Sequence, residues 1–373
     1  MQMTRIKLSA LWATVNLNIS MADIIGFIRP GTSQKILNSD FGSQDTINVE
    51  ALTMQAVVRE QYGSPAVLRL EEVQKPTPKA GEVLIRVHAA SPNAADLHLL
   101  RGQPFMLRLV YGLFRPKIRV LGTAVAGRVE AVGAGVTRFH VGDEVFADLS
   151  GCGLGGFAEY ACTPEAMLAR MPANVGFAAA ATVPLAGVTA LQALRDKGRV
   201  RAGQKVLIYG ASGGVGTFAL QLAKHFGAEV TAVCSTRKAE LVRSLGADRV
   251  IDYTFEDFTS GGTRYDLILA INGDRSIREY KRALSPNGTC VVVGGSLRQI
   301  FGAVLLGPLL GGRQKFASLI ATPSAADLEL LRGLLEAGKI APVIDRSYSL
   351  SEVPQALQYL AEGRAKGKVV ITV

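Results

Sequence analysis

Lys205–Gly227 reads KVLIYGASGGVGTFALQLAKHFG, and this stretch is the strongest indicator of the fold. The continuous apolar run within Lys205–Gly210 is typical of a strand buried on both faces of a parallel sheet. From about Thr217 the apolar residues recur at helical spacing until Gly227, a residue type that often ends helices. A strand, a glycine-rich turn and a helix in this order predict the first unit of a doubly wound α/β domain.

Downstream, the alternation of strands and helices continues. More apolar runs follow, separated by segments with helical spacing such as AELVRSLG. Repeats of this kind predict a parallel sheet with helices on both faces, and we assign it to residues 172–339. The predicted strands are EVTAVC (229–234), RVIDY (249–253), YDLILAI (265–271) and GTCVVVGG (288–295).

Upstream, residues 54–171 show a different pattern. Short runs such as EVLIRVHAA (82–90) alternate apolar and polar residues and are punctuated by glycine, which predicts a small β-rich domain. The last residues, KGKVVITV (366–373), form a strand that most simply returns to this domain. We therefore predict one domain from 54–171 plus 340–373. Residues 1–53 lack a sustained period and are predicted to be an N-terminal extension, disordered rather than packed.

Composition limits the classes of function. With 373 residues, 48% of them hydrophobic, the chain is long enough for two domains with buried cores. The formal charge of +10 favours anionic ligands, but no basic run with interleaved aromatic residues predicts nucleic-acid binding. The four cysteines form no C-x-x-C pair, which favours free thiols in a reducing compartment and so a cytoplasmic location. No apolar run reaches the ~18 residues expected of a membrane-spanning helix.

The glycine-rich turn predicts a dinucleotide site. It follows a strand and opens a helix, which is the context that this fingerprint requires. Gly213 lets the backbone approach a pyrophosphate, Gly216 allows close packing of the helix on the strand, and the helix N-terminus attracts phosphate. The predicted pyrophosphate-binding residues are Ala211, Ser212, Gly213, Gly214, Val215 and Gly216.

The end of the second strand indicates which dinucleotide binds. Sites for NAD place a carboxylate there for the ribose 2′-hydroxyl, about 20 residues after the glycines. This chain has CSTRK at 234–238 and no acid. Ser235, Arg237 and Lys238 suit a 2′-phosphate, so NADPH is predicted. The alternative is that these three residues only begin a solvated helix.

Several segments carry a resemblance to a known family. In chain order they are VGAGVTRFHVGDEV (132–145), GGFAEYA (155–161), PLAGVTALQAL (184–194), GASGGVGTFALQLAK (210–224) and LGAD…VIDY (245–253). On these motifs, residues 54–373 resemble the medium-chain dehydrogenase/reductase superfamily, in its zinc-independent quinone oxidoreductase-like branch. The resemblance implies a GroES-like domain, a Rossmann domain, a cofactor cleft between them and a homodimer.

The resemblance also predicts that no metal is bound. Zinc-dependent members bind their catalytic metal at three places, which here hold Asn93, Thr123 with Ala124, and Leu185. None of these is a usual zinc ligand. Without a Lewis acid, hydride transfer should favour small apolar acceptors whose conjugation spreads the incoming charge. The leading interpretation is an NADPH-dependent reductase of quinones or enones, and an NADPH-binding protein with little turnover is the alternative.

Further cofactor contacts are implied by the resemblance alone. Thr189 is expected at the nicotinamide end, with a helix N-cap or an internal turn as the alternative. Lys368 is expected to reach back to the cofactor from the last strand, with a plain surface lysine as the alternative. The other expected contacts are Tyr253, Asn272, Gly273, Gly294 and Gly295.

Asn93 and His98 are the candidate catalytic residues. Both lie in SPNAADLHLLRG, where quinone oxidoreductases carry an asparagine near the substrate and a tyrosine at the position of His98. Histidine titrates near neutral pH, so His98 is expected to supply the proton that follows the hydride. The alternative is a solvated or packed histidine, with the proton coming from water. Asp96 is expected to fix the local turn.

Two segments without acidic residues combine cations with apolar side chains. One lies between Asp96 and Glu130, and the other between Glu279 and Asp327. A peripheral membrane contact, centred on 297–316, is one interpretation. A buried pocket wall or a dimer contact is the other, and the sequence favours it.

Overall fold

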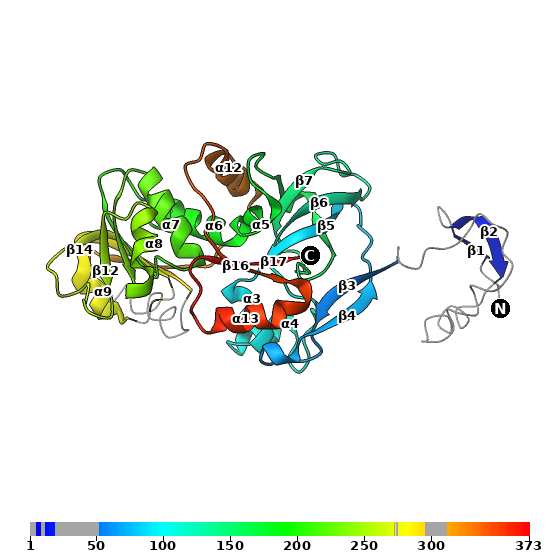
Figure 1. Cartoon of the computed structure of the whole chain (residues 1–373), viewed down its shortest axis with the longest axis horizontal. Coiled ribbons are helices and arrows are strands. Elements are labelled where there is room, and N and C mark those ends of the chain that lie inside the picture. The colour runs from blue at the N-terminus through cyan, green and yellow to red at the C-terminus, as the bar shows by residue number, and fades with distance from the viewer. Residues whose placement is uncertain (1–4, 9–11, 19–51, 272, 274, 295–311) are drawn as a thin grey trace. The chain divides into compact units, whose positions relative to one another are not determined.

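The computed structural model describes residues 5–8, 12–18, 52–271, 273, 275–294 and 312–373. The chain divides into two units, residues 1–50 and 51–373. In the first unit, β1 (Arg5–Leu8) pairs with β2 (Trp12–Asn18) in the antiparallel sense (Figure 1). The sequence did not predict this pair, because residues 1–53 show no sustained alternation.

Six parallel strands form the sheet that the strand–helix repeats predict. Their order is β12-β11-β10-β13-β14-β15, so the strand of the glycine motif, β10 (Lys205–Tyr209), lies between β11 and β13. Val206 and Ile208 pack into the core on one face and Leu207 into the core on the other, as expected of a strand covered on both sides. The other strands are β11 (Glu229–Cys234), β12 (Arg249–Asp252), β13 (Tyr265–Ile271), β14 (Leu284–Val293) and β15 (Lys315–Leu319).

Helix α7 (Gly214–His225) follows β10 through the glycine-rich turn. It begins before the expected Thr217, because the glycines at its start carry no side chains that would show the helical period. It ends before Gly227, whose φ of +79° suits the left-handed position after a helix. The other helices that accompany this sheet are α6 (Val183–Gln192), α8 (Ala239–Ser244), α9 (Ile277–Ala283) and α12 (Ala325–Glu336).

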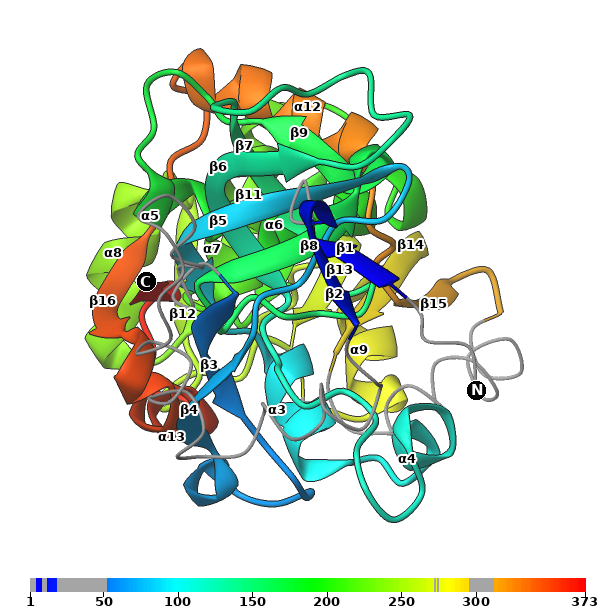
Figure 2. The same cartoon turned by 90° about the vertical axis from the view of Figure 1, so that its right-hand side faces the viewer.

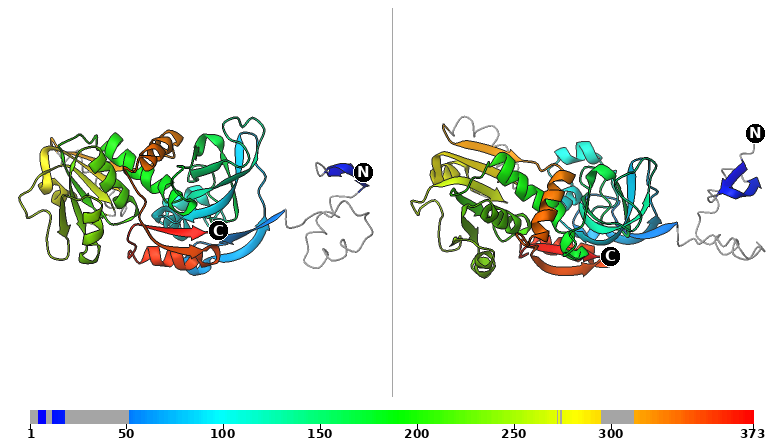
Figure 3. Two further views of the ribbon diagram at one scale, coloured as in Figure 1. Left: turned by 45° about the horizontal axis from the view of Figure 1, so that its top comes forward. Right: turned by 90° about the horizontal axis from the view of Figure 1, so that it is seen from above.

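A second sheet has the order β16-β17-β5-β6-β7-β9, with β8 attached to β5. Its strand β17 (Lys368–Thr372) pairs with β5 (Glu82–Ser91) and places Ile371 opposite Ala90. The predicted return of the C-terminal strand is therefore confirmed (Figure 3). The remaining strands are β6 (Ala124–Val132), β7 (Glu144–Asp148), β8 (Tyr160–Pro164), β9 (Leu168–Arg170) and β16 (Ile344–Ser349), together with the antiparallel pair of β3 (Thr53–Val58) and β4 (Arg69–Gln74).

Helix α6 lies between the two sheets (Figure 1), and one continuous core holds Leu191 of α6, Ile208 of β10 and Phe146 of β7. No helix in the described part of the chain combines the length and the apolarity that crossing a bilayer requires. The four cysteines are free thiols. The remaining helices are α3 (Ala94–Arg101), α4 (Met106–Tyr111), α5 (Phe177–Ala180) and α13 (Val353–Ala361).

Candidate functional site

The turn after β10 contains two glycines whose side-chain positions are filled by backbone. Gly210 has a φ of +82°, and a Cβ there would lie 2.3 Å from the carbonyl oxygen of Ile271. A Cβ on Gly216 would lie 2.2 Å from the carbonyl oxygen of Gly210. Atoms do not approach so closely, so the tight turn and the close contact of α7 with it both require glycine.

Gly213 differs, because the protein does not fill the space where its side chain would be. It is the N-cap of α7, and a Cβ there would approach only the carbonyl oxygen of Gly210, at 3.6 Å. The first N–H groups of a helix have no partner inside the helix, and they form the positive end of its dipole. No acidic residue lies in the first turn of α7. The open space and the positive helix end fit a phosphate group.

The residues expected to select the dinucleotide follow β11. Ser235 is half-buried, whereas Arg237 is exposed. The ammonium of Lys238 donates to the carbonyl oxygens of Ala365, at 2.8 Å, and Gly363, at 3.4 Å, and burial lowers the pKa of Lys238. Lys238 therefore holds the segment before β17 against the residues that follow β11. Exposed Arg237 is the cation better placed to bind the 2′-phosphate of NADPH.

Lys368 lies against the glycine-rich turn. It is 3% exposed, and a Cβ on Gly214 would lie 2.8 Å from its Cδ. The neighbouring Gly367 donates its N–H to the carbonyl oxygen of Ser212 at 2.9 Å, and it forms an isolated β-bridge with Gly213. The surface-lysine alternative is therefore wrong, and the last strand touches the turn that fits a phosphate.

A chain of hydrogen bonds joins Lys368 to three other buried side chains. Its Nζ donates to Asn93 Oδ1 at 2.5 Å and to the carbonyl oxygen of Pro92 at 3.4 Å. Asn93 Nδ2 donates in turn to Thr123 Oγ1 at 2.9 Å. The Thr123 hydroxyl donates to Asp96 Oδ2 at 3.0 Å. We call Asn93, Asp96, Thr123 and Lys368 the buried polar network.

Within this network, Asp96 holds two segments of the chain together. Its Oδ2 accepts the N–H of Asn93 at 2.8 Å, and its Oδ1 accepts the N–H of Gly122 at 3.1 Å. Because α3 begins just after Asn93 and β6 begins just after Thr123, the carboxylate fixes the start of the helix against the entry to the strand. The expected role of Asp96 in fixing the local turn is confirmed.

Burial opposes both charges of the buried polar network. It raises the pKa of Asp96 to about 6, although three hydrogen-bond donors and the charge of Lys368 act in the opposite direction. Burial also lowers the pKa of Lys368 to about 8, and the charge of Asp96 partly offsets this. Both groups are therefore charged in the window between these two values.

Thr189 and His98 occupy quite different surroundings. Thr189 lies inside α6, is 7% exposed, and its hydroxyl donates to the carbonyl oxygen of Leu185 at 2.6 Å. It is therefore neither a helix N-cap nor a turn residue. His98 is exposed on α3, and its Nδ1 lies 3.1 Å from the carbonyl oxygen of Gln103.

Three more of the expected cofactor residues follow strands of the parallel sheet. Exposed Tyr253 follows β12, Gly273 comes after β13, and Gly294, with a φ of +73°, follows β14. Ligands of such sheets bind outside the carboxyl ends of the strands, which is where these residues lie. A Cβ on Gly273 would lie 2.1 Å from the hydroxyl oxygen of Tyr280, so this position has no room for a side chain. Asn272 and Gly295 lie outside the described residues.

Thr123 is a site residue that the sequence interpretation missed. It compared Asn93 and Thr123 separately with metal-binding positions, and their hydrogen bond to each other did not follow from that comparison. One signal could have predicted this hydrogen bond. In zinc-dependent members the residues at these two positions bind the same metal ion, so their side chains must lie close together. In the described part of the chain, no group of three or more His, Cys, Asp or Glu side chains is placed to hold a metal ion.

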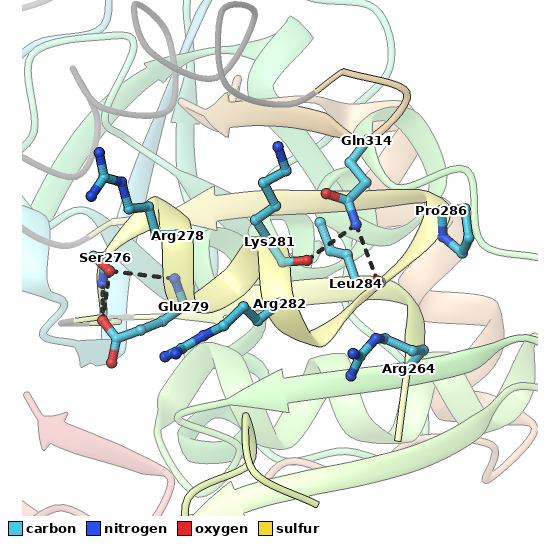
Figure 4. Close-up of a pocket in the computed structure, with 9 residues that line it drawn as sticks. All are labelled: Arg264, Ser276, Arg278, Glu279, Lys281, Arg282, Leu284, Pro286 and Gln314. Carbon is cyan, nitrogen blue, oxygen red and sulfur yellow. Dashed lines mark hydrogen bonds between the residues drawn. The ribbon is translucent and has the colours of Figure 1, made fainter. Parts of the chain in front are cut away.

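A separate hollow of about 830 Å³ lies beside α9 (Figure 4). Its walls carry four cationic side chains, and Glu279 in the same wall pairs with Arg275 at 3.1 Å. None of the predicted site residues lines it, so it is not part of the candidate cofactor site. The four cations are Arg264, Arg278, Lys281 and Arg282.

Two family models match this chain. Residues 79–173 match the model described as alcohol dehydrogenase GroES-like domain, and residues 245–371 match the one described as zinc-binding dehydrogenase. Together they cover the β-rich region from just before β5 onward and the second half of the parallel-sheet region through to β17.

Individual relatives are similar over nearly their whole length. A chloroplast envelope quinone oxidoreductase homolog of Arabidopsis thaliana is 35% identical over 85% of this chain and 98% of its own. An NADPH-dependent alkenal/one oxidoreductase of the same plant is 36% identical over 91% of this chain and 86% of its own. The solved quinone oxidoreductase from Coxiella burnetii has a TM-score of 0.78 and 32% identity, covering 86% of this chain and 99% of its own. This chain therefore belongs to the medium-chain dehydrogenase/reductase superfamily, in its quinone oxidoreductase-like branch, and is an oxidoreductase that uses a nicotinamide cofactor.

Proposed function

We propose that this oxidoreductase transfers hydride from NADPH to a small apolar quinone or α,β-unsaturated carbonyl compound, without a metal. The observation that carries the proposal is the position of Lys368, which contacts the turn at Gly214 and also binds Asn93. It connects the open space beside Gly213 to the residues that stand at the zinc positions of other members. Two of the relatives, a quinone oxidoreductase homolog and an alkenal/one oxidoreductase, support this class of acceptor.

Two segments would bind the cofactor: the glycine-rich turn at 210–216 and the residues after β11, at 234–238. The N–H groups at the start of α7, from Gly214 to Gly216, would hold the pyrophosphate. Ser235 and Arg237 would hold the 2′-phosphate, and no carboxylate at 234–238 repels it. When bound, NADPH supplies the hydride.

Lys368 adds positive charge at this turn. An ammonium has three N–H groups, and two of them donate to Pro92 and Asn93. We assign the third to the cofactor phosphates, because the lysine stem lies against Gly214 at the helix start. The ammonium would then balance charge that the helix end alone balances only in part.

Asn93 is better described as a positioning residue than as a contact of the acceptor. Both N–H groups of its amide donate inside the protein, to the Ser91 carbonyl oxygen at 2.8 Å and to Thr123. Its amide oxygen accepts from Lys368. The side chain therefore orients the lysine, and donation from its amide to the carbonyl oxygen of an acceptor would break one of these bonds.

Independence of zinc rests on the chemistry of the residues at the metal positions. An amide, a hydroxyl and an aliphatic side chain stand there, and Asn93 and Thr123 are hydrogen-bonded to each other. Conjugated acceptors suit such a site because they delocalise the incoming charge. We assign the following proton to exposed His98, with water as the alternative donor.

The test is NADPH oxidation by purified protein across a panel of quinones, enones and simple ketones. We expect oxidation that depends on a quinone or an enone, that no simple ketone supports, and that survives exhaustive treatment with a zinc chelator. Tight NADPH binding with no acceptor-dependent oxidation would instead establish the alternative, a cofactor-binding protein with little turnover.

Replacing Arg237 with alanine should weaken NADPH binding about tenfold and leave NADH binding unchanged, because a hydrogen bond to a charged phosphate contributes about 1.5–3 kcal/mol. Lys238→Ala is the comparison: two of its three N–H groups already donate to Ala365 and Gly363, so it should lose less NADPH affinity than Arg237→Ala does. Fluorescence titration of both cofactors measures the two affinities. An equal loss of NADH and NADPH binding in Arg237→Ala would remove the 2′-phosphate assignment.

The affinity for NADPH should depend on the charge of Lys368. Its pKa of about 8 means that the ammonium is present below that pH and is lost above it. We expect the dissociation constant of NADPH to be level between pH 7 and about 8 and to rise at higher pH. Lys368→Arg, which stays charged, should flatten the profile, and Lys368→Met should bind weakly at every pH. A wild-type profile that is level to pH 10 would contradict this role.

A further inference from the structure

Six large apolar side chains between residues 105 and 114 are exposed. Helix α4 contains no buried residue, and Phe114 in the loop after it is 86% exposed. Apolar groups gathered in this way mark contact sites with a partner or a membrane. We call this set the 105–114 apolar patch. Its members are Phe105, Met106, Leu109, Val110, Leu113 and Phe114, which are between 42% and 86% exposed.

Contacts of Gly112 and Arg108 with the rest of the protein hold the backbone of the 105–114 apolar patch in place. The Tyr62 hydroxyl donates to the carbonyl oxygen of Gly112 at 2.7 Å. The Arg108 guanidinium lies 4.6 Å from the centre of the Tyr62 ring and donates to the carbonyl oxygens of Gly102 and Arg101. The apolar side chains are therefore presented outward by a fixed segment. The interpretation of this segment as a buried pocket wall is wrong for these residues.

Cations without carboxylate partners flank the patch. Arg101, Arg115 and Lys117 are exposed, and none of them takes part in an ion pair among the described residues. Arg119 differs, because it pairs with Glu60 and Glu71. No acidic residue occurs between Asp96 and Glu130, so the segment offers apolar groups together with positive charge only.

The segment leaves and re-enters the fold at the buried polar network. It continues from α3, which Asn93 precedes, and it returns through Leu121 and Gly122 to Thr123. Figure 2 shows α4 at the lower edge of the second unit. Two short stretches of chain therefore connect the 105–114 apolar patch, and whatever it binds, to the candidate site.

We propose that the 105–114 apolar patch docks on an anionic lipid surface. Peripheral binding of this kind combines burial of apolar side chains with attraction between cations and acidic headgroups. A second copy of the chain fits less well: in a twofold contact each patch meets itself, which would bring Arg101, Arg115 and Lys117 close to the same cations of the partner. An anionic membrane complements these charges.

Flotation of the full chain with lipid vesicles tests this proposal without any cofactor or acceptor, so its outcome is separate from that of the proposed function. We expect the chain to float with vesicles of phosphatidylcholine and phosphatidylglycerol and to bind phosphatidylcholine vesicles much less. Phe105→Ser with Phe114→Ser should lower the partition coefficient about tenfold or more. Phe255→Ser is the matched control, since Phe255 is 82% exposed but lies outside the patch. Arg115→Gln with Lys117→Gln should weaken binding only to the acidic vesicles.

Three results would overturn the proposal. The first is a wild type that stays unbound with acidic vesicles, and the second is a double phenylalanine variant that floats as well as Phe255→Ser does. Equal binding to neutral and acidic vesicles would remove the role of the cations. Molar mass by light scattering tests whether a second copy of the chain covers the patch instead. In that case the wild type would be a dimer that does not float, and the phenylalanine substitutions would convert it to a monomer. Unchanged thermal unfolding of each variant shows that it has folded.

Discussion

Replacing Gly213 with valine should weaken NADPH binding about a hundredfold and lower the stability of the fold by only about 1 kcal/mol, because valine is a poorer helix N-cap than glycine. The backbone of Gly213, with a φ of −85° and a ψ of 178°, is one that any residue adopts, and an added Cβ clears the protein. The valine methyl groups would instead occupy the open space at the start of α7. A phosphate held away from those N–H groups loses one or two hydrogen bonds to a charged ligand, each contributing about 1.5–3 kcal/mol.

Gly216→Ala is the informative comparison for this experiment. Its Cβ would meet the carbonyl oxygen of Gly210 at 2.2 Å, so the turn would have to move and the unfolding temperature should fall. Calorimetric titration with NADPH and thermal unfolding therefore separate the two glycines: one variant loses the ligand and the other loses stability. Wild-type affinity in Gly213→Val would show that the phosphate does not lie at this helix start.

The sequence predicts the parallel sheet well because its signals are local. The apolar run at Lys205–Gly210, the glycine turn and the helical spacing to Gly227 all lie within one short stretch, and each matches the observed element. Within this stretch the start of α7 was misplaced, since four of the residues at 210–216 are glycines without informative side chains. Farther along the chain, β14 begins at Leu284 rather than Gly288, and β15 was not predicted. The hairpin of β1 and β2 carries no such pattern and was not predicted.

The buried polar network could not be predicted, because its members are distant in sequence. Lys368 and Asn93 are 275 positions apart, and only the pairing of β17 with β5 brings them together. By resemblance, sequence reasoning placed Lys368 near the cofactor and Asn93 near the substrate, without their contact. It also gave Lys238 the same role as Arg237, and it could not show that carbonyl oxygens near β17 already engage that ammonium.

Some predictions concern features that the structure leaves untested. The homodimer, the cytoplasmic location and the domain limits at 53, 171 and 339 stay predictions. A membrane contact through 297–316 falls mostly outside the described residues, which resume at 312. The exposed patch at 105–114 shows why composition alone was insufficient: the sequence gives its apolar residues and cations, but only the packing of Tyr62 and Arg108 shows which side faces out.

Replacing Asp96 with alanine should destabilise the protein by about 3 kcal/mol at pH 7, the largest loss that we expect from a single substitution in this site. The change leaves three buried donors without an acceptor: the N–H groups of Asn93 and Gly122 and the hydroxyl of Thr123. Asp148→Ala is the matched control. Asp148 is also buried, at 3% exposure, but among the described residues its hydrogen bonds come from Ser150 alone, so its loss should cost about 1 kcal/mol.

The pH dependence of this loss has a definite sign. Burial raises the pKa of Asp96 from 3.8 to about 6, so the folded protein holds this proton more tightly than the unfolded chain does. The contribution of Asp96 to the free energy of unfolding is therefore greatest below pH 3.8, and it declines as the pH rises to about 6. Chemical denaturation should show a difference between wild type and Asp96→Ala that is about 1 kcal/mol larger at pH 5 than at pH 7. A difference that grew toward pH 7 would mean that the ionised carboxylate is the favoured form in the fold, and the ammonium of Lys368 would then outweigh the cost of burial.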